Sequence, residues 1–162
     1  MKLRHIALTI FCLIMLPGLA AQAANWPSKP VRILVSFPPG GSSDLVARLL
    51  SKHLTDKFGQ QFVVENKPGA GGTVAATALK REKGDGHTFM LSNLAPYSIA
   101  PTLFRKIPYD ALKDFAHVSY IGTVYLGLFV SPKLGVKTLK DFVAKAKAEP
   151  GKLDFGSSGV GS

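Results

Sequence analysis

The chain has 162 residues, and its 20 Lys and Arg outnumber its 10 Asp and Glu, which gives a formal net charge of +10 at pH 7. The basic residues are scattered, which argues against a nucleic-acid surface, although a general positive field would still attract small anions. The single cysteine, Cys12, lies in a segment that we expect to be removed, which excludes disulfides, thiolate metal sites and a cysteine nucleophile from the mature chain.

The first segment has the organisation of a secretory signal. Lys2 and Arg4 precede an apolar run over 6–16, and small residues ending in Ala21-Gln22-Ala23 follow it. The run is shorter than the ~20 residues that span a bilayer, so a signal peptide is favoured over a membrane anchor. We predict cleavage after Ala23 and export from the cytoplasm.

A first strand is expected over 31–37, where apolar and β-branched residues dominate until Pro38-Pro39 interrupts the run. Gly40-Gly41 follows as a turn, and Gly59 ends the helix after it. That helix has one apolar face, formed at spacings of three and four by Leu45, Val46, Leu49, Leu50, Leu54 and Phe58. A strand that leads directly into a helix leaves N–H groups unpaired at the positive end of the helix dipole, and anions bind at such ends.

Two more strand–helix pairs follow. A strand is expected over 62–66, then a Gly-rich turn over 67–73 and a helix of small residues over 74–79. A third strand over 87–91 is followed by a helix over 95–103. Alternating strands and helices with short connections indicate a parallel sheet with right-handed crossovers, so the predicted fold class is α/β.

The pattern changes beyond this point. Extended segments are expected over 118–121 and 126–130, then a helix over Thr138–Ala148 and a further strand over 153–155. The chain stops in a Gly/Ser-rich loop that should open a helix in this architecture. We therefore expect a fragment of a longer protein, the alternative being a complete domain with a frayed tail.

The predicted strand ends point to a binding site, because open parallel sheets bind ligands outside the carboxyl ends of their strands. Four such ends are recognisable, at 37–44, 66–73, 92–93 and 156–162. Three of them are rich in Gly with Ser or Thr, which lets backbone N–H groups approach a ligand and adds hydroxyl donors. Because these loops contain no Arg and Lys67 is their only Lys, they suit a carboxylate better than a polyphosphate.

Two residues at these ends carry more specific hypotheses. Asp44 permits two interpretations: a carboxylate stabilised by the dipole of the first helical turn, or a contact with an ammonium or hydroxyl group of a ligand. Ser92, with Asn93 beside it, ends the third strand and is a candidate for setting ligand specificity.

Motifs of other site types are absent or incomplete. A Walker loop needs Gly-Lys-Ser/Thr after the first strand and a dinucleotide fingerprint needs G-x-G-x-x-G there, and neither is present. His53, His87 and His117 lack metal-ligand spacing, so no metal site is expected. The stretch 156–159 only approximates the G-x-S-x-G elbow of serine hydrolases, and an exported α/β hydrolase with Ser158 as nucleophile remains an alternative function.

Five segments carry a resemblance to a known family: PSKPVRILVSFPPGGSSDLVARLLSKHL, GQQFVVENKPGAGGTVAATALK, GDGHTFML, IPYDALKDFAHVSYIG and AKAEPGKLDFGSSGVGS. They run in order from Trp26 to Ser162, and FPPGG-x-x-D and VVEN-x-PGAGG are the most specific. The chain resembles the extracytoplasmic receptors of tripartite tricarboxylate transporters, the Bug family. Because proteins of that family are longer, the resemblance implies that this chain corresponds to their first half.

The resemblance implies a type II periplasmic-binding-protein fold, in which a small carboxylate is enclosed between two lobes. On this basis residues 1–23 are the signal peptide, 24–121 an incomplete first α/β lobe, and 122–162 the crossover and truncated start of a second α/β lobe. It also implies a periplasmic monomer that delivers its ligand to membrane transporter subunits, without catalysis, cofactor or nucleic acid. A non-functional truncated product is the remaining alternative.

The site residues follow from the same resemblance. In such receptors the loop after the first strand, the GAGG loop and the S-x-G-x-G-S loop approach the ligand carboxylate, partly through water. The candidate ligand-binding residues carried over, with Ser92 added from the third strand end, are Phe37, Gly40, Gly41, Ser43, Asp44, Ala70, Gly71, Gly72, Thr73, Ser92, Ser157, Ser158 and Gly161.

Overall fold

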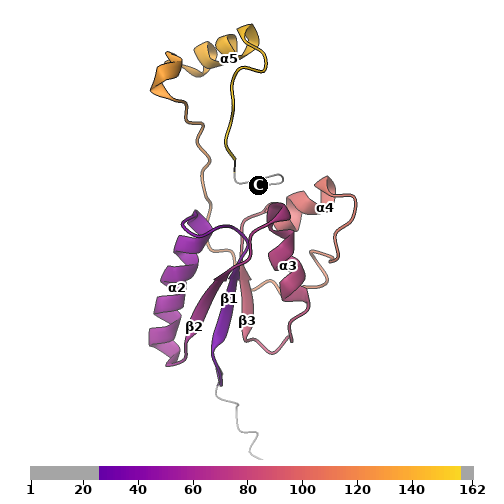
Figure 1. Ribbon diagram of the computed structural model, residues 1–162. Coiled ribbons are helices and arrows are strands. Elements are labelled where there is room, and N and C mark those ends of the chain that lie inside the picture. Colours follow the sequence, from indigo (N-terminus) through magenta and orange to yellow (C-terminus); the bar gives the residue numbers. More distant parts are fainter. Residues whose placement is uncertain (1–25, 158–162) are drawn as a thin grey trace, which may run out of the picture.

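The computed structural model describes residues 26–157, and its main body is built on a three-stranded parallel sheet (Figure 1). Strand β1 (Val31–Val35) is central, with β2 (Phe62–Asn66) on one side and β3 (Thr88–Leu91) on the other. Both neighbours pair with β1 in parallel, so all three carboxyl ends lie at the same edge. The predicted parallel sheet is therefore confirmed.

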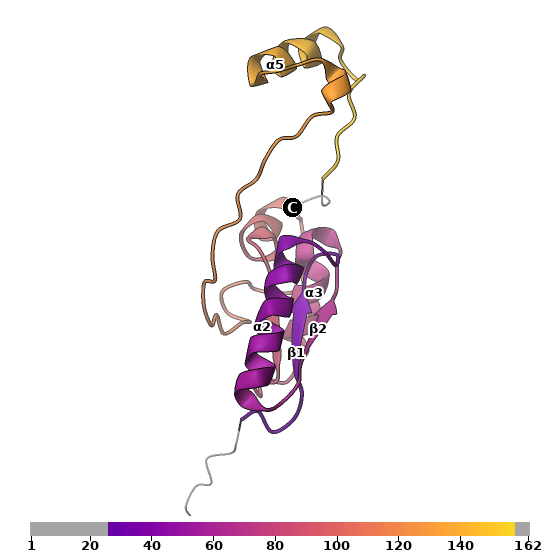
Figure 2. The same ribbon diagram turned by 90° about the vertical axis from the view of Figure 1, so that its left-hand side faces the viewer.

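Helices cover both faces of the sheet. Helix α2 (Ser42–Phe58) lies in front of the strands in Figure 2, and α3 (Thr73–Lys80) lies behind them. Gly59 ends α2 in the left-handed conformation, with φ of 68°, as its position in the sequence predicts. This arrangement confirms the α/β fold class, while the predicted signal peptide over 1–23 lies outside the described residues.

The face toward α2 holds the larger apolar core. Alternate residues of β1 point to this side because successive side chains of a strand point to opposite faces. They pack with Ala47 of α2 and with side chains of both neighbouring strands; the buried members of the cluster are Val31, Ile33, Val35, Ala47 and Phe62. Full burial of one such aliphatic side chain is worth about 1.5–3 kcal/mol, so this cluster is a main source of the lobe's stability.

The face toward α3 is closed by a returning loop. Ala76 of α3 packs with Tyr109 and Ala111, and Met90 of β3 lies against them. The Tyr109 hydroxyl donates a hydrogen bond of 2.6 Å to the carbonyl oxygen of Pro96, which fixes the loop against the segment that follows β3. Residues 26–115, here called the sheet lobe, therefore have an apolar core on each side of the sheet.

The helix expected over 95–103 forms as two pieces. A π-helical turn, η2 (Ala95–Ile99), passes into a short α-helix, α4 (Ala100–Leu103). Pro101 lies in the first turn of α4, where its missing N–H removes no hydrogen bond that an α-helix would make. The prediction of helix is confirmed, and the proline explains why a new helical segment begins at this point.

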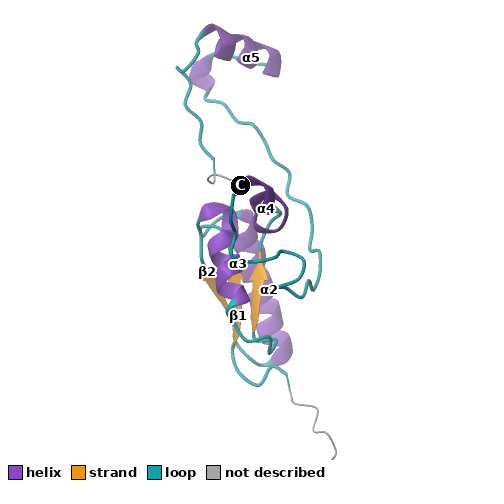
Figure 3. Ribbon diagram, turned by 90° about the vertical axis from the view of Figure 1, so that its right-hand side faces the viewer, coloured by secondary structure: helices purple, strands orange, loops and turns teal. Residues whose placement is uncertain are grey.

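Beyond the sheet lobe the chain extends away as a separate arm (Figure 3). Its described part contains a 3₁₀ turn, η3 (Pro132–Leu134), and helix α5 (Leu139–Ala148). Thr138 caps α5 as predicted: its hydroxyl accepts from the Asp141 N–H at 3.1 Å, and the Asp141 carboxylate accepts from the Thr138 N–H at 3.2 Å. After α5 the chain runs back toward the sheet lobe.

Three strand-like predictions in this arm need correction. The segments over 118–121 and 126–130 form no sheet with any described residue, and the strand predicted over 153–155 is absent from the structure. Their side chains are suited to strands, but a strand is stable only when its N–H and C=O groups pair with another. Within 26–157, no helix is long and apolar enough to cross a bilayer.

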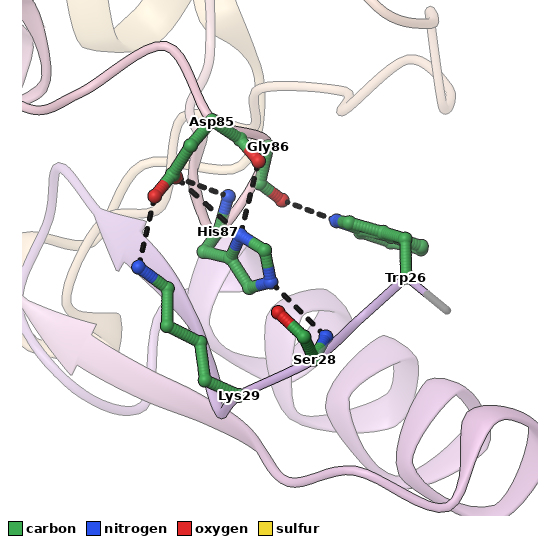
Figure 4. Close-up of polar contacts among 6 residues, drawn as sticks. All are labelled: Trp26, Ser28, Lys29, Asp85, Gly86 and His87. Atoms are coloured by element: carbon green, nitrogen blue, oxygen red, sulfur yellow. Dashed lines mark hydrogen bonds and ion pairs between the residues drawn. The ribbon is translucent and has the colours of Figure 1, made fainter. Parts of the chain in front are cut away.

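The start of the described chain is anchored at the opposite edge of the sheet from the carboxyl ends (Figure 4). The Trp26 indole N–H donates to the Gly86 carbonyl oxygen at 3.1 Å, and Lys29 forms an ion pair of 2.8 Å with Asp85. The Ser28 N–H donates to Nε2 of His87 at 3.3 Å, so the His87 proton resides on Nδ1, which donates to the Asp85 carbonyl oxygen. Three contacts thus tie this segment to the turn before β3.

Candidate ligand-binding site

The three loops that follow β1, β2 and β3 meet at the carboxyl edge of the sheet. Ten of the thirteen predicted site residues lie in them or in the first turns of α2 and α3: Phe37, Gly40, Gly41, Ser43, Asp44, Ala70, Gly71, Gly72, Thr73 and Ser92. Ser157 lies at the end of the described arm, while Ser158 and Gly161 lie outside the described residues. The parallel order of the strands places the loops that carry the first ten at one edge of the sheet.

Gly72 shows how closely these loops approach one another. It is buried, its φ is 87°, and a Cβ atom placed on it would lie 3.1 Å from Cδ of Pro96 and 3.2 Å from Cβ of Ser36. Pro96 belongs to η2 and Ser36 follows β1, so the backbone of the loop after β2 is in contact with the other two loops. Only glycine fits this contact without displacing a neighbour.

The loop after β2 has an unusual backbone. Positive φ values occur at four consecutive residues, 133° at Gly69, 45° at Ala70, 60° at Gly71 and 87° at Gly72. The alanine among them is strained, since a left-handed conformation costs an L-residue with a Cβ roughly 1–2 kcal/mol. Strain of this kind persists where the surrounding structure enforces it, and it concentrates at binding sites.

Two helix N-termini point their first N–H groups into this edge. The N-cap residues are Gly41 for α2 and Gly72 for α3, and neither helix has a side-chain cap. The first backbone hydrogen bond of α2 runs from the Leu45 N–H to the Gly41 carbonyl oxygen, at 3.0 Å. The N–H groups before it have no intrahelical partner, so the positive end of α2 is open to an anion. At the start of α3 the N–H groups of Gly72 and Thr73 donate to the carbonyl oxygens of Gly69 and Ala70, which leaves the N–H groups of Ala70 and Gly71 in the same loop for a ligand.

Asp44 is buried and is surrounded by donors. Its Oδ2 accepts from the Arg48 guanidinium and from the Gly40 N–H, both at 2.9 Å, and its Oδ1 accepts from the Asn66 amide at 3.0 Å. The Arg48 hydrogen bond, followed by those from Gly40 and Asn66, holds the pKa of the Asp44 carboxyl well below its usual range. Asn66 also donates to the Phe37 carbonyl oxygen at 3.0 Å. Ionised Asp44 thus braces the loop after β1 against the end of β2.

Sequence reasoning missed three residues of this edge. Arg48 could have been found, because acidic and basic residues four apart on a helix form ion pairs. Asn66 and Ser36 had weaker signals, each being a polar residue that ends a mostly apolar strand. Their contacts with Asp44 and Ser92 cross between loops, and local patterns do not reveal such contacts.

The charge balance of the edge favours a ligand held by neutral donors. Lys67, the one cation of the predicted loops, forms an ion pair of 2.5 Å with Glu65, whose other partner is Arg32. These hydrogen bonds, from Lys67 first and then from Arg32, lower the pKa of Glu65. Within 26–157, no group of three or more His, Cys, Asp or Glu side chains is placed to hold a metal ion.

Comparison with known proteins identifies the family. A family model described as the tripartite tricarboxylate transporter family receptor matches residues 46–162, which include the loops after β2 and β3. The chain belongs to this receptor family. The resemblance carried by the sequence motifs is therefore confirmed, and the family is one of solute receptors rather than enzymes.

The chain has curated and solved relatives of greater length. Protein BugT of Bordetella pertussis is 38% identical over 165 residues, covering 100% of this chain and 51% of BugT. A Rhodopseudomonas palustris protein solved with adipate is 33% identical with a TM-score of 0.80, covering 85% of this chain and 46% of that one. MatC of the same organism, solved with bound malate, is 40% identical with a TM-score of 0.53, covering 56% of this chain and 31% of MatC.

Two conclusions follow for the chain. Its backbone matches solved periplasmic binding proteins, so the predicted periplasmic-binding-protein-like fold is confirmed. The chain spans about half the length of the relatives that it matches, as expected for the first half of such a receptor.

Proposed function

We propose that this protein is an extracytoplasmic solute receptor that binds a small carboxylate and delivers it to a tripartite tricarboxylate-type transporter. The observation that carries the proposal is the meeting of two uncapped helix N-termini with a positive-φ glycine loop at one sheet edge. Backbone N–H groups in this arrangement bind anions. The relatives solved with adipate and malate support a carboxylate as that anion.

We assign separate contacts with the ligand to each loop of the edge. The N–H groups of the first turn of α2, reached past Gly40 and Gly41, would donate to one carboxylate oxygen, and those of Ala70 and Gly71 to the other, with Gly72 and Thr73 holding the loop in shape. Ser43, Thr73 and Ser92 would add hydroxyl donors. Hydrogen bonds to charged groups contribute about 1.5–3 kcal/mol each. A few of them are of the right order for micromolar affinity, which needs about 8 kcal/mol.

Asp44 has a different part in this proposal. Its carboxylate already accepts three hydrogen bonds from the protein, and it is negatively charged. We assign it to holding the loop after β1 in place, with any ligand contact limited to a hydroxyl or ammonium group distant from the carboxylate. Phe37, whose carbonyl oxygen is held by Asn66, would form part of the same wall.

The remaining elements of the proposal concern the whole protein. Cleavage after Ala23 would release the receptor into the periplasm as a monomer. The arm that contains α5 would begin the second lobe, and Ser157, Ser158 and Gly161 would approach the ligand from that side. No cofactor or catalytic residue is part of the proposal.

Calorimetry against adipate, malate and uncharged diamide controls tests the proposed function. It should be run on the protein from its complete coding sequence and on the mature chain ending at Ser162. We expect the complete product to bind at least one carboxylate and no diamide. If no member of a wide carboxylate panel binds, the receptor function is wrong; if only the complete product binds, the 162-residue chain alone is a non-functional part.

A matched pair of variants tests the α2 N-terminus itself. Ser42 is the first helical residue, where proline is tolerated, and Gly41 before it has φ of −76° and ψ of 169°, a conformation that proline allows. Ser42→Pro removes one backbone N–H donor, while Ser42→Ala keeps it and removes only the hydroxyl. We expect about a tenfold weaker affinity, or about 1.4 kcal/mol, for Ser42→Pro alone. Equal affinities for the two variants would exclude this helix end from the site.

A further inference from the structure

Ser36 is a polar residue enclosed at the centre of the carboxyl edge. It follows directly after β1, the middle strand, and its exposed fraction is 0%. The contact with Gly72 described above covers it from the side of the β2 loop. A buried hydroxyl is costly unless it is hydrogen-bonded, so its partner matters.

That partner is the hydroxyl of Ser92, at the end of the neighbouring strand. Val35 of β1 pairs with Leu91 of β3, so Ser36 and Ser92 are the next residues along the two strands. Their Oγ atoms are in direct hydrogen-bonding contact, and Ser92 is only partly buried. The geometry of the two oxygens alone leaves both directions of donation open.

Burial decides the direction. Among the described residues, the Ser36 hydroxyl has no hydrogen-bond partner besides Ser92. If Ser92 donated to Ser36, the Ser36 proton would be enclosed without an acceptor, which costs the full desolvation of that group. If Ser36 donates instead, its proton is satisfied and the Ser92 proton is free to point toward the open side of the edge.

We propose that Ser36 is a positioning residue that donates to Ser92 and thereby directs the Ser92 O–H at a carboxylate of the ligand. A hydroxyl that accepts one hydrogen bond becomes a stronger donor in the next. The contact with Ser36 occupies one lone pair of the Ser92 oxygen and leaves its O–H available as a donor, so it favours a ligand group that accepts, as an ionised carboxylate does. The inference rests on the proposed function and adds to it a residue that does not itself touch the ligand.

A double-mutant cycle tests the relay, with adipate and malate as probes and the complete gene product as the protein. Ser36→Ala should weaken carboxylate binding about three- to tenfold when Ser92 is present, and should have no further effect in a Ser92→Ala background. Ser92→Ala should weaken binding tenfold or more. Ser98→Ala, which removes an exposed serine hydroxyl from η2, is the matched control and should bind as the wild type does.

Stability provides a second test of the dependence of Ser36 on Ser92. Ser92→Ala leaves the buried Ser36 hydroxyl without an acceptor, whereas Ser36→Ala/Ser92→Ala removes both partners together. We therefore expect the double variant to unfold at higher urea concentration than Ser92→Ala alone. A double variant less stable than Ser92→Ala would overturn the inference, because the buried Ser36 hydroxyl would then be satisfied without Ser92.

The outcomes separate this inference from the proposed function. A wild type that binds no carboxylate overturns the proposed function. A wild type that binds, with Ser36→Ala causing the same loss in both backgrounds, overturns the relay alone, because Ser36 would then act without Ser92. Loss that depends on Ser92 supports both.

Discussion

The sheet lobe and the arm beyond it contain similar apolar side chains in opposite surroundings. Leu34 of β1 is fully buried, whereas Leu126 of the arm is 97% exposed; Phe62 is 5% exposed and Phe129 is 91% exposed. Hydrophobic character alone therefore does not decide burial. In the lobe each strand has a partner and a covering helix, and in the stretch 118–130, here called the exposed segment, no described residue supplies either.

Protease sensitivity should show the largest difference between the two regions. We expect chymotrypsin to cleave the mature chain first within the exposed segment, at Tyr120, Tyr125 or Phe129, because open chain needs no unfolding before it enters a protease. Cleavage at Phe62 or Tyr109 should be slower by orders of magnitude, since it requires opening of the lobe. Mass spectrometry of a time course measures this, and early products cut inside the lobe would contradict the comparison.

Matched leucine truncations should differ by several kcal/mol. Leu34→Ala leaves a cavity in the core and should destabilise the lobe by about 2–5 kcal/mol. Leu126→Ala removes an exposed side chain and should change the free energy of unfolding by less than about 0.5 kcal/mol. Urea unfolding followed by circular dichroism measures both, and a substantial loss for Leu126→Ala would mean that the exposed segment packs in solution.

Two glycine substitutions should show a smaller difference within the lobe. Gly72→Ala places a methyl group against Pro96 and Ser36 at a positive φ, and overpacking of this kind costs typically about 1–3 kcal/mol. Gly84→Ala is the control, because a Cβ there meets nothing within 4 Å. If the two variants unfold at the same urea concentration, the close approach of the three loops is wrong.

The smallest effect should come from the anchored segment at the other edge. The Lys29 ammonium, and then the His87 N–H, lower the pKa of Asp85 to about 2. A carboxyl whose pKa is lower in the folded state adds stability above its unfolded pKa, near 4, and loses it as pH falls toward 2. Asp85→Asn should therefore lower the thermal midpoint at pH 7 and match the wild type near pH 2. A difference that persists at pH 2 would mean that the charge is not its source.

The strands and helices of the lobe could be predicted because each is marked by residues within it or directly beside it in the sequence. The strand over 62–66 has the predicted bounds, and those over 31–37 and 87–91 differ from the structure by two residues at most. Gly59 and Thr138 mark helix ends through chemistry that acts within a few residues. The position of the loops at one edge then follows from the parallel order of the strands.

The incorrect strand prediction and the missed site residues share one cause. Each depends on a contact with a residue that is distant in the sequence. The stretch 153–155 has the composition of a strand, but pairing is a property of two segments, and one segment cannot show it. The brace between Asp44 and Asn66 and the pair of Ser36 with Ser92 likewise join loops that are separated in sequence by 22 and 56 residues. Such contacts become visible only when the fold places the loops together.

Trp26 gives the protein a natural spectroscopic label. It is the only tryptophan in the chain, and its ring meets those of Phe58, Phe62 and Phe89 nearly edge-on, with centroids 5.3 to 6.3 Å apart. Since it lies at the edge of the sheet opposite the Gly-rich loops, its emission reports release of the anchored segment and is insulated from direct contact with a bound solute. A change in that emission on addition of solute would show that binding is felt along the full length of the strands.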